Sequence, residues 1–317
     1  MVAVRMKERT LEHQPVLLQA VLDNLAIKAS GVYVDATFGR GGHAKAILDH
    51  LGPTGRLLAM DKDPDAISFA CQHFSKDKRF TIQQGSFKDL HAFLQKEKFE
   101  GNVDGILFDL GVSSPQLENA TRGFSFLHSG PLDMRMDNTK GMRASEWISK
   151  VSEKELANVL WEYGEERFAK KISRAIIKAR DEISITTTEA LAKIIAKAHP
   201  AWQKGKHPAT KSFQAIRIKI NDELKDLHEG LEESKRALKI GGRLCVISFH
   251  SLEDRIVKHF IQPPVESSML HAPLPIKYTP CEKTFKKMGR AIKPTDEEIR
   301  MNGRSRSAIL RVGEKIS

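Results

Sequence analysis

The sequence predicts an α/β fold: a mostly parallel sheet interrupted by an inserted helical domain. Over the first third of the 317 residues, apolar runs alternate with helical segments, the pattern of parallel strands covered on both faces. Strand-like alternation stops between about residues 117 and 212, and an apolar strand follows near residue 243. We therefore expect residues 1–117 and 213–317 to form the core, and 118–212 to form a helical domain for substrate recognition.

The elements of the first third follow from apolar runs and helix-compatible spacing. Strands are expected at 32–37, 56–60, 80–83 and 103–109, and helices at 43–51 and 64–74.

The middle of the chain is expected to be helical. Two capping-box patterns, Ser152-Glu-Lys-Glu155 and Thr186-Thr-Thr-Glu189, each precede a run with helical spacing. The region ends in a basic loop that carries Lys204, Lys206, His207 and Lys211.

A long amphipathic helix is expected next, from Phe213 to about Ile240, with Gly241-Gly242 ending it as a left-handed cap. Strands at 243–249 and 307–312 and a helix at 252–261 then complete the core.

Composition limits the classes of protein and partner. The net charge of +11 favours a polyanionic partner such as nucleic acid. The N-terminus lacks a signal-peptide pattern, and no apolar run is long enough to span a membrane. The three cysteines are far apart and form no CxxC pair, which argues against a zinc site or a disulfide framework and fits a reducing cytoplasm.

The segment 32–43, VYVDATFGRGGH, predicts a nucleotide-like cofactor. Its glycines Gly39, Gly41 and Gly42 loosely match the dinucleotide fingerprint at the start of a helix. About 20 residues on, Asp61 ends the second strand, where it could accept both ribose hydroxyls of an adenosine. The alternatives are a plain tight turn and a helix-capping role for Asp61. Nicotinamide and S-adenosylmethionine sites share this geometry.

The fourth strand favours S-adenosylmethionine. Asp109 ends that strand and leads into a polar loop, LGVSSPQ, at the carboxyl edge of the sheet, where ligands of α/β proteins bind. A carboxylate there suits hydrogen bonding to a substrate amine. The alternative is that Asp109 caps the loop through its own backbone.

Aromatic and imidazole groups follow two other strands. Phe249 could stack on an extruded base and His250 could bond it, or Phe249 is core and Ser251 caps a helix with Asp254 at the third position. Phe87 could flank an adenine or pack in the core.

Charged residues alternate with apolar ones in TRGFSFLHSGPLDMRMD. Either these charges line the substrate cleft or they form a structural network. The residues concerned are Arg122, Asp133, Arg135 and Asp137.

Together these segments resemble the bacterial 16S ribosomal RNA cytosine-N4 methyltransferase family, from about His13 to Val312. The motifs that carry the resemblance are TFGRGGH at 37–43, DLGVSSPQL at 109–117, RGFSF at 122–126, GPLDMRMD at 130–137, YGEERFAK at 163–170, HPAT at 207–210 and SFHSLEDRIVK at 248–258. The resemblance implies a class I, Rossmann-like methyltransferase core with a helical insertion. It also implies methyl transfer from S-adenosylmethionine to the N4 amine of a cytosine in the decoding region of 16S rRNA in the small ribosomal subunit.

The family's cofactor contacts fall on seven positions of this chain. They are Gly41, Gly42, His43, Asp61, Phe87, Asp109 and Gln116. Only Gln116 was not already a candidate from the residues themselves. The chain departs from the family pattern at 262–302, which concerns the RNA-facing surface.

We expect direct in-line transfer, in which Asp109 orients the amine while Phe249 and His250 hold the base. One rival is a carbon-5 cytosine methyltransferase, which needs a cysteine nucleophile such as Cys281 or Cys245. Another rival is a non-catalytic RNA-binding assembly factor, and a nicotinamide dehydrogenase would lack a hydride-transfer site. No membrane partner and no metal are expected, and a homodimer is left open.

Overall fold

The computed structural model describes residues 15–201, 207–264 and 283–317. The chain divides into two compact units. The sheet unit comprises Met1–Gly111 and Asp226–Ser317, and the helical unit comprises Val112–Lys225. The helical unit is longer at both ends than the insertion expected at 118–212.

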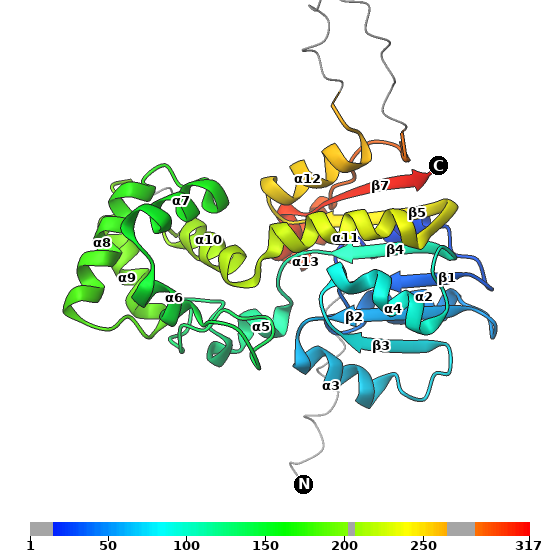
Figure 1. Ribbon diagram of the computed structural model, residues 1–317, viewed down its shortest axis with the longest axis horizontal. Coiled ribbons are helices and arrows are strands. Elements are labelled where there is room, and N and C mark those ends of the chain that lie inside the picture. The colour runs from blue at the N-terminus through cyan, green and yellow to red at the C-terminus, as the bar shows by residue number, and fades with distance from the viewer. Residues whose placement is uncertain (1–14, 202–206, 265–282) are drawn as a thin grey trace, which may run out of the picture. The chain divides into compact units, whose positions relative to one another are not determined.

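The sheet unit is built on seven strands in the order β3-β2-β1-β4-β5-β7-β6 (Figure 1). Their bounds are β1 Val32–Asp35, β2 Arg56–Asp61, β3 Phe80–Gln84, β4 Val103–Asp109, β5 Leu238–Ser248, β6 Phe285–Lys287 and β7 Ile309–Lys315. Strands β1 to β5 are parallel, while β7 runs antiparallel to both β5 and β6. The α/β prediction is confirmed; β6 was not predicted.

Helices cover both faces of this sheet, which explains the continuous apolar runs of its central strands. Helices α1 (Leu18–Leu25), α2 (Gly42–His50) and α3 (Pro64–His73) share one apolar cluster with Leu107 of β4. Helices α4 (Leu90–Glu97), α11 (Glu223–Ala237) and α12 (Ser251–Ile261) share another with Ile106 and Phe108. Short η2 (Phe87–Asp89), α13 (Asp296–Met301) and η5 (Gly303–Ser307) complete the unit.

The prediction of one long helix at 213–240 is wrong, because two helices occupy this stretch. Helix α10 (Thr210–Asn221) ends at Asp222, which has a left-handed φ of 52°, and α11 begins at the next residue. The Asn221 side chain donates to Met134 O at 2.8 Å and accepts from Met136 N at 2.7 Å. Contacts distant in the sequence therefore hold the break. The pair Gly241-Gly242 lies inside β5, beside a register shift against β4, and caps no helix.

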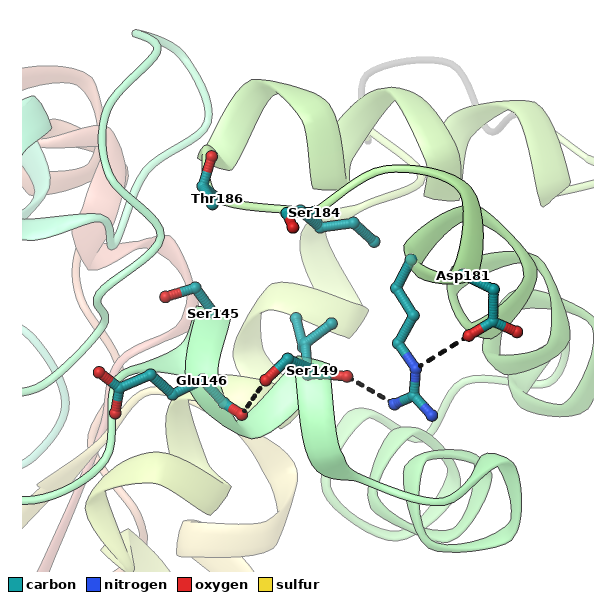
Figure 2. Close-up of a pocket in the computed structure, with 9 residues that line it drawn as sticks. Ser145, Glu146, Ser149, Asp181, Ser184 and Thr186 are labelled. Atoms are coloured by element: carbon teal, nitrogen blue, oxygen red, sulfur yellow. Dashed lines mark hydrogen bonds and ion pairs between the residues drawn. The ribbon is translucent and has the colours of Figure 1, made fainter.

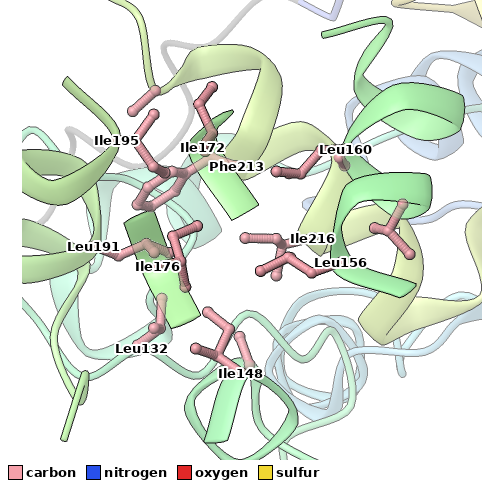
Figure 3. Close-up of a cluster of buried hydrophobic side chains, with 14 of the residues drawn as sticks. Leu132, Ile148, Leu156, Leu160, Ile172, Ile176, Leu191, Ile195, Phe213 and Ile216 are labelled. Atoms are coloured by element: carbon pink, nitrogen blue, oxygen red, sulfur yellow. The ribbon is translucent and has the colours of Figure 1, made fainter. Parts of the chain in front are cut away.

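The helical unit packs around its own apolar core (Figure 3). Its elements are α5 Ser114–Glu118, η3 Ala120–Arg122, α6 Ala144–Lys150, α7 Glu153–Gly164, α8 Ala169–Glu182, α9 Thr188–Ala198 and α10. Leu160, Ile176 and Ile216 are fully buried in this core.

Of the two predicted capping boxes, only the first begins a helix where expected. Ser152 Oγ accepts from Glu155 N at 3.1 Å and caps α7. At the second, Thr187 is the cap, because the carbonyl of Thr186 accepts from Leu132 N at 2.8 Å in an extended pairing. That pairing delays the helix by one residue.

Within the described ranges, no helix is long and apolar enough to cross a membrane. The same ranges contain no cluster of three His, Cys, Asp or Glu side chains suited to a metal ion.

Candidate active site at the carboxyl edge of the sheet

The glycine turn joins the end of β1 to the start of α2. Gly41 caps α2 with φ of +72°, and a Cβ built on it would lie 2.6 Å from Phe38 Cζ. A Cβ on Gly42 would lie 2.4 Å from Pro15 Cγ. Both glycines are therefore required because a Cβ at either position would clash with the protein's own side chains. From the sequence, we expected the absence of a Cβ to serve the approach of a ligand. The first N–H groups of α2 point out of this turn beyond the reach of intrahelical carbonyls.

Asp61 ties the glycine turn to the end of β2. Its Oδ2 accepts from Gly39 N at 2.7 Å and its Oδ1 from Asp63 N at 2.8 Å. The cap of α3 is Asp63, which accepts from Asp65 N, so the capping alternative for Asp61 is wrong. Burial raises the pKa of Asp61 to about 6. Each carboxyl oxygen keeps a lone pair that could accept from a ribose hydroxyl.

Asp109 and His43 face each other at this edge. Asp109 Oδ2 lies 3.6 Å from His43 Nε2, and the backbone N–H of Asp109 donates to Thr37 Oγ1 at 2.6 Å. Three buried atoms of this pair have no hydrogen-bond partner in the described part of the chain: both ring nitrogens of His43 and Oδ1 of Asp109. The alternative that Asp109 caps its own loop is therefore not what the structure shows.

Burial controls the charge of this pair. It lowers the pKa of His43 to about 4, so the imidazole is neutral near pH 7. It raises the pKa of Asp109 to about 8, with smaller contributions from the nearby carboxyls of Asp35 and Glu253. The Asp109 side chain remains 26% exposed, so substrate can reach it.

Asp35 was missed by sequence reasoning. Its side chain is buried, Oδ1 accepts from Thr37 N at 3.2 Å, and Oδ2 has no partner among the described residues. Burial raises its pKa to about 7, with a smaller contribution from Asp61. The available signal was that β1, β2 and β4 all end in aspartate. Buried polar atoms without partners cost free energy, and such groups concentrate where ligands bind.

The turn after β5 is organised by Glu253, which sequence reasoning also missed. Glu253 Oε2 accepts from the backbone N–H groups of Phe249 at 2.8 Å and of His250 at 3.3 Å. The Glu253 side chain is only 3% exposed. This buried carboxylate therefore holds the turn that presents Phe249, whose ring packs half-buried against the cluster under α1 and α2.

His250 is the N-cap of α12, so the alternative in which Ser251 caps the helix with Asp254 at the third position is wrong. Its Nδ1 accepts from Glu253 N at 3.4 Å, and its Nε2 lies 3.1 Å from Glu253 Oε1. Asp254 instead accepts from Arg311 of β7 at 2.7 and 2.9 Å. The helix begins one residue earlier than this alternative placed it, so His250 takes the capping role and Asp254 forms an ion pair instead. Contact between His250 and a base stays a prediction.

Phe87 begins η2 and packs edge-on against Phe108, with ring centroids 5.3 Å apart. It is half-buried, so core packing accounts for one part of the ring and the rest is accessible.

Gln116 belongs to α5 of the helical unit. Its Oε1 accepts from Ser113 N at 2.9 Å in a capping box that starts α5. The side chain is buried, and its role toward the cofactor stays a prediction.

The alternating charges of the helical unit form a structural network. Arg135 binds Asp133 with two bonds of 2.7 Å. Arg122 is buried and donates to the carbonyls of Arg135 and Met136 at 3.2 and 2.7 Å. Asp137 accepts from Thr139 at 2.5 Å. These contacts support the structural-network interpretation, and a role of the segment in lining the substrate cleft stays a prediction.

Only part of the predicted basic loop falls within the residues that the structure describes. Lys204 and Lys206 lie outside them. The ring of His207 lies 4.6 Å from that of Phe126, and Lys211 donates to Glu165 O at 2.8 Å.

A cavity of about 320 Å³ lies in the helical unit, and none of the predicted site residues lines it (Figure 2). Ser145, Ser149, Ser184 and Thr186 contribute hydroxyl groups to its lining. Its cation, Arg180, already donates to the carbonyls of Ile148 and Val151, both at 2.6 Å.

The chain is similar to known proteins over nearly its full length. Residues 10–316 match the family described as the MraW methylase family. The chain is 53% identical over 306 residues to "Ribosomal RNA small subunit methyltransferase H" of Legionella pneumophila strain Paris, covering 96% of this chain and 99% of that protein. It is 52% identical over 307 residues to the protein of the same name from Coxiella burnetii strain RSA 493, with the same coverage. A solved rRNA methylase from Streptococcus thermophilus aligns with a TM-score of 0.44 at 12% identity, covering 96% of this chain and 99% of that one.

Proposed function

The chain belongs to the MraW methylase family, and we propose that it transfers a methyl group from S-adenosylmethionine to the N4 amine of a cytosine in 16S rRNA. The observation that carries the proposal is the 52–53% identity, over nearly the full length, to the ribosomal RNA small subunit methyltransferases H. At the sheet edge, the Asp109 carboxyl has one oxygen, Oδ1, without a hydrogen-bond partner among the described residues, and this carboxyl is the group that would bind the substrate amine.

The residues at this edge fit S-adenosylmethionine. Asp61 would accept from the ribose hydroxyls, while the backbone N–H groups of Gly42 and His43, which have no intrahelical acceptor at the start of α2, would take the methionine carboxylate. Gly41 shapes that turn, Phe87 would flank the adenine, and Gln116 enters through the family resemblance. The orphaned buried atoms of His43 and Asp35 are the structural sign of a missing polar partner.

S-adenosylmethionine, when bound, supplies an electrophilic methyl group, and the cytosine amine is the nucleophile. That amine is weak because its lone pair is delocalised into the ring. Asp109 in its ionised form accepts a hydrogen bond from the amine and favours a pyramidal nitrogen, which stabilises the transition state. Neutral His43, 3.6 Å away, adds no positive charge that would compete for the carboxylate.

Phe249 would stack on the cytosine, with His250 beside it on the turn held by Glu253. Since that turn is fixed by buried hydrogen bonds, the enzyme contributes mainly by positioning the base.

The carbon-5 alternative is disfavoured at Cys245. This thiol is buried inside β5, and burial raises its pKa to about 12, so the nucleophilic thiolate does not form near pH 7. Cys281, the other candidate, lies outside the described residues.

Mass mapping of small-subunit RNA tests the proposal. Cells lacking this protein should lose one N4-methylcytosine, and purified enzyme with S-adenosylmethionine should restore it. Unchanged RNA would contradict the proposal. Calorimetry separates the assembly-factor alternative, which predicts no binding of S-adenosylmethionine. We infer action on small subunits in the cytoplasm.

A further inference from the structure

A short basic turn lies at the same sheet edge as Asp109. Strand β7 is antiparallel to β5, so its first residue, Ile309, pairs with Ser248 at the last residue of β5. The turn that precedes β7, residues 302–308, is therefore next to the Phe249–His250 turn. None of the cofactor and base contacts proposed above uses it.

This turn is rigid. Asn302 Oδ1 accepts from Arg304 N at 3.1 Å, and the fully buried Ser305 donates through Oγ to Asn302 O at 2.7 Å. Ala308, also buried, closes the turn by donating to Ser305 O at 2.8 Å. With Ser305 turned inward, Arg304 and Arg306 on either side of it are exposed.

The turn is also fastened to the base-holding elements. Ser248 Oγ donates to Ile309 O at 3.3 Å. Arg311, two residues into β7, binds Asp254 in the first turn of α12 through two bonds. The position of Arg304 and Arg306 relative to the Phe249–His250 turn is therefore set by side-chain as well as backbone contacts.

The charge of the segment favours an anion. Between Asn302 and Ser307 there are two arginines and no acidic residue. The acidic residues nearest in sequence are on α13, where Glu298 Oε1 accepts from Leu17 N at 2.6 Å. Guanidinium groups match the geometry of phosphate oxygens and stay charged at every physiological pH.

We propose that Arg304 and Arg306 bind backbone phosphates of the RNA strand that flanks the target cytosine. This inference rests on the proposed function. A cytosine extruded toward Asp109 brings its neighbouring phosphates to the rim of the same edge, where these guanidiniums lie. Phosphate contacts fix the register of the strand without reading its bases.

The test is a steady-state methylation assay on small subunits from cells that lack the protein. For Arg304→Ala/Arg306→Ala we expect KM for subunits to rise about tenfold with kcat changed by less than about twofold. The slope of log kcat/KM against log salt should become shallower by about 1.4, because each single-strand phosphate contact contributes about 0.7. Arg306→Ala alone should give about half of that change, and Arg304→Lys/Arg306→Lys should keep most of the slope.

Arg236→Ala is the matched control. This arginine is 67% exposed at the end of α11, just before β5 begins and therefore at the opposite edge of the sheet. Its KM and salt slope should equal those of the wild type.

The outcomes separate this inference from the proposed function. A double alanine variant with wild-type KM and salt slope would overturn the inference. So would a loss of S-adenosylmethionine affinity in calorimetry equal to the loss of activity, since the turn would then act on the cofactor pocket. If the double variant does not fold, a wild-type slope in Arg306→Ala decides against it. Wild-type enzyme that methylates no subunits would instead refute the proposed function.

Discussion

The helical unit and the carboxyl edge of the sheet both bury charged side chains, but they satisfy them differently. In the helical unit, Arg135 is matched by Asp133 through two hydrogen bonds of 2.7 Å. At the sheet edge, Asp35 and Asp109 each leave one carboxyl oxygen without a partner, and His43 leaves both ring nitrogens. Apart from Asp35, these residues all lie in motifs of the same family resemblance.

We expect this difference to separate structural charges from functional ones. A buried charge with complete hydrogen bonding maintains the fold, and removing one partner exposes the other to an uncompensated desolvation cost. A buried polar group without a partner instead lowers stability until a ligand supplies the missing bond. The two clusters should therefore respond oppositely to substitution.

The largest expected effect is on stability, in the helical unit. Arg135→Ala should lower the free energy of unfolding by about 3 kcal/mol, because it leaves the largely buried Asp133 without its two short guanidinium hydrogen bonds. Arg143→Ala is the control: this arginine also contacts Asp133, at 3.4 Å, but is 57% exposed, so its loss should cost less than about 0.5 kcal/mol. Chemical denaturation measures both. Equal losses would show that the network is not the stabilising feature.

The next effect is on activity without a loss of stability. Asp109→Asn should lower kcat by more than about tenfold, because the amide cannot carry the negative charge that orients the amine. Its free energy of unfolding should not fall, since an ionisable group without a hydrogen-bond partner has been replaced by a neutral one. Asp104→Asn, on the same strand but paired with Lys28 and Lys239, should do the reverse. Methylation at the wild-type rate by Asp109→Asn would remove the proposed role.

The smallest effect is the pH dependence of kcat/KM. The Asp109 pKa of about 8 means that the active carboxylate forms as pH rises through 8. Between pH 8 and pH 7, kcat/KM should therefore fall about fivefold, as expected for loss of one ionised group. Asp109→Asn should lack this limb. A wild-type profile that is flat from pH 6 to 9 would show that Asp109 is ionised throughout.

Much of the sheet unit could be predicted because its signals are local. The apolar runs of β1, β2, β3 and β4, the glycine turn and the aspartates that end β2 and β4 are all visible within a few residues. Parallel topology then brings the strand ends to one edge, so Asp61 and Asp109 could be assigned to one site without coordinates.

Other features depend on contacts between residues far apart in the chain. The amphipathic pattern continues across Asn221 and Asp222, and only bonds from Asn221 to Met134 and Met136 show that the helix breaks there. Similarly, Thr186 has the sequence of a helix cap but pairs with Leu132 instead.

The sequence alone determined the fold class, the edge at which the proposed site lies and the carboxylates that end β2 and β4, because hydrophobic periodicity is a property of neighbouring residues. Only the tertiary structure decided which buried groups are satisfied. It paired Arg135 with Asp133 but left polar atoms of Asp35, His43 and Asp109 without hydrogen-bond partners. It also placed Glu253 where its carboxylate holds the turn after β5, and it brought the turn at 302–308 to the same edge. The physical reason is that hydrogen bonding of a buried group depends on which residues distant in the sequence lie beside it in space. Hydrophobic periodicity does not specify those neighbours.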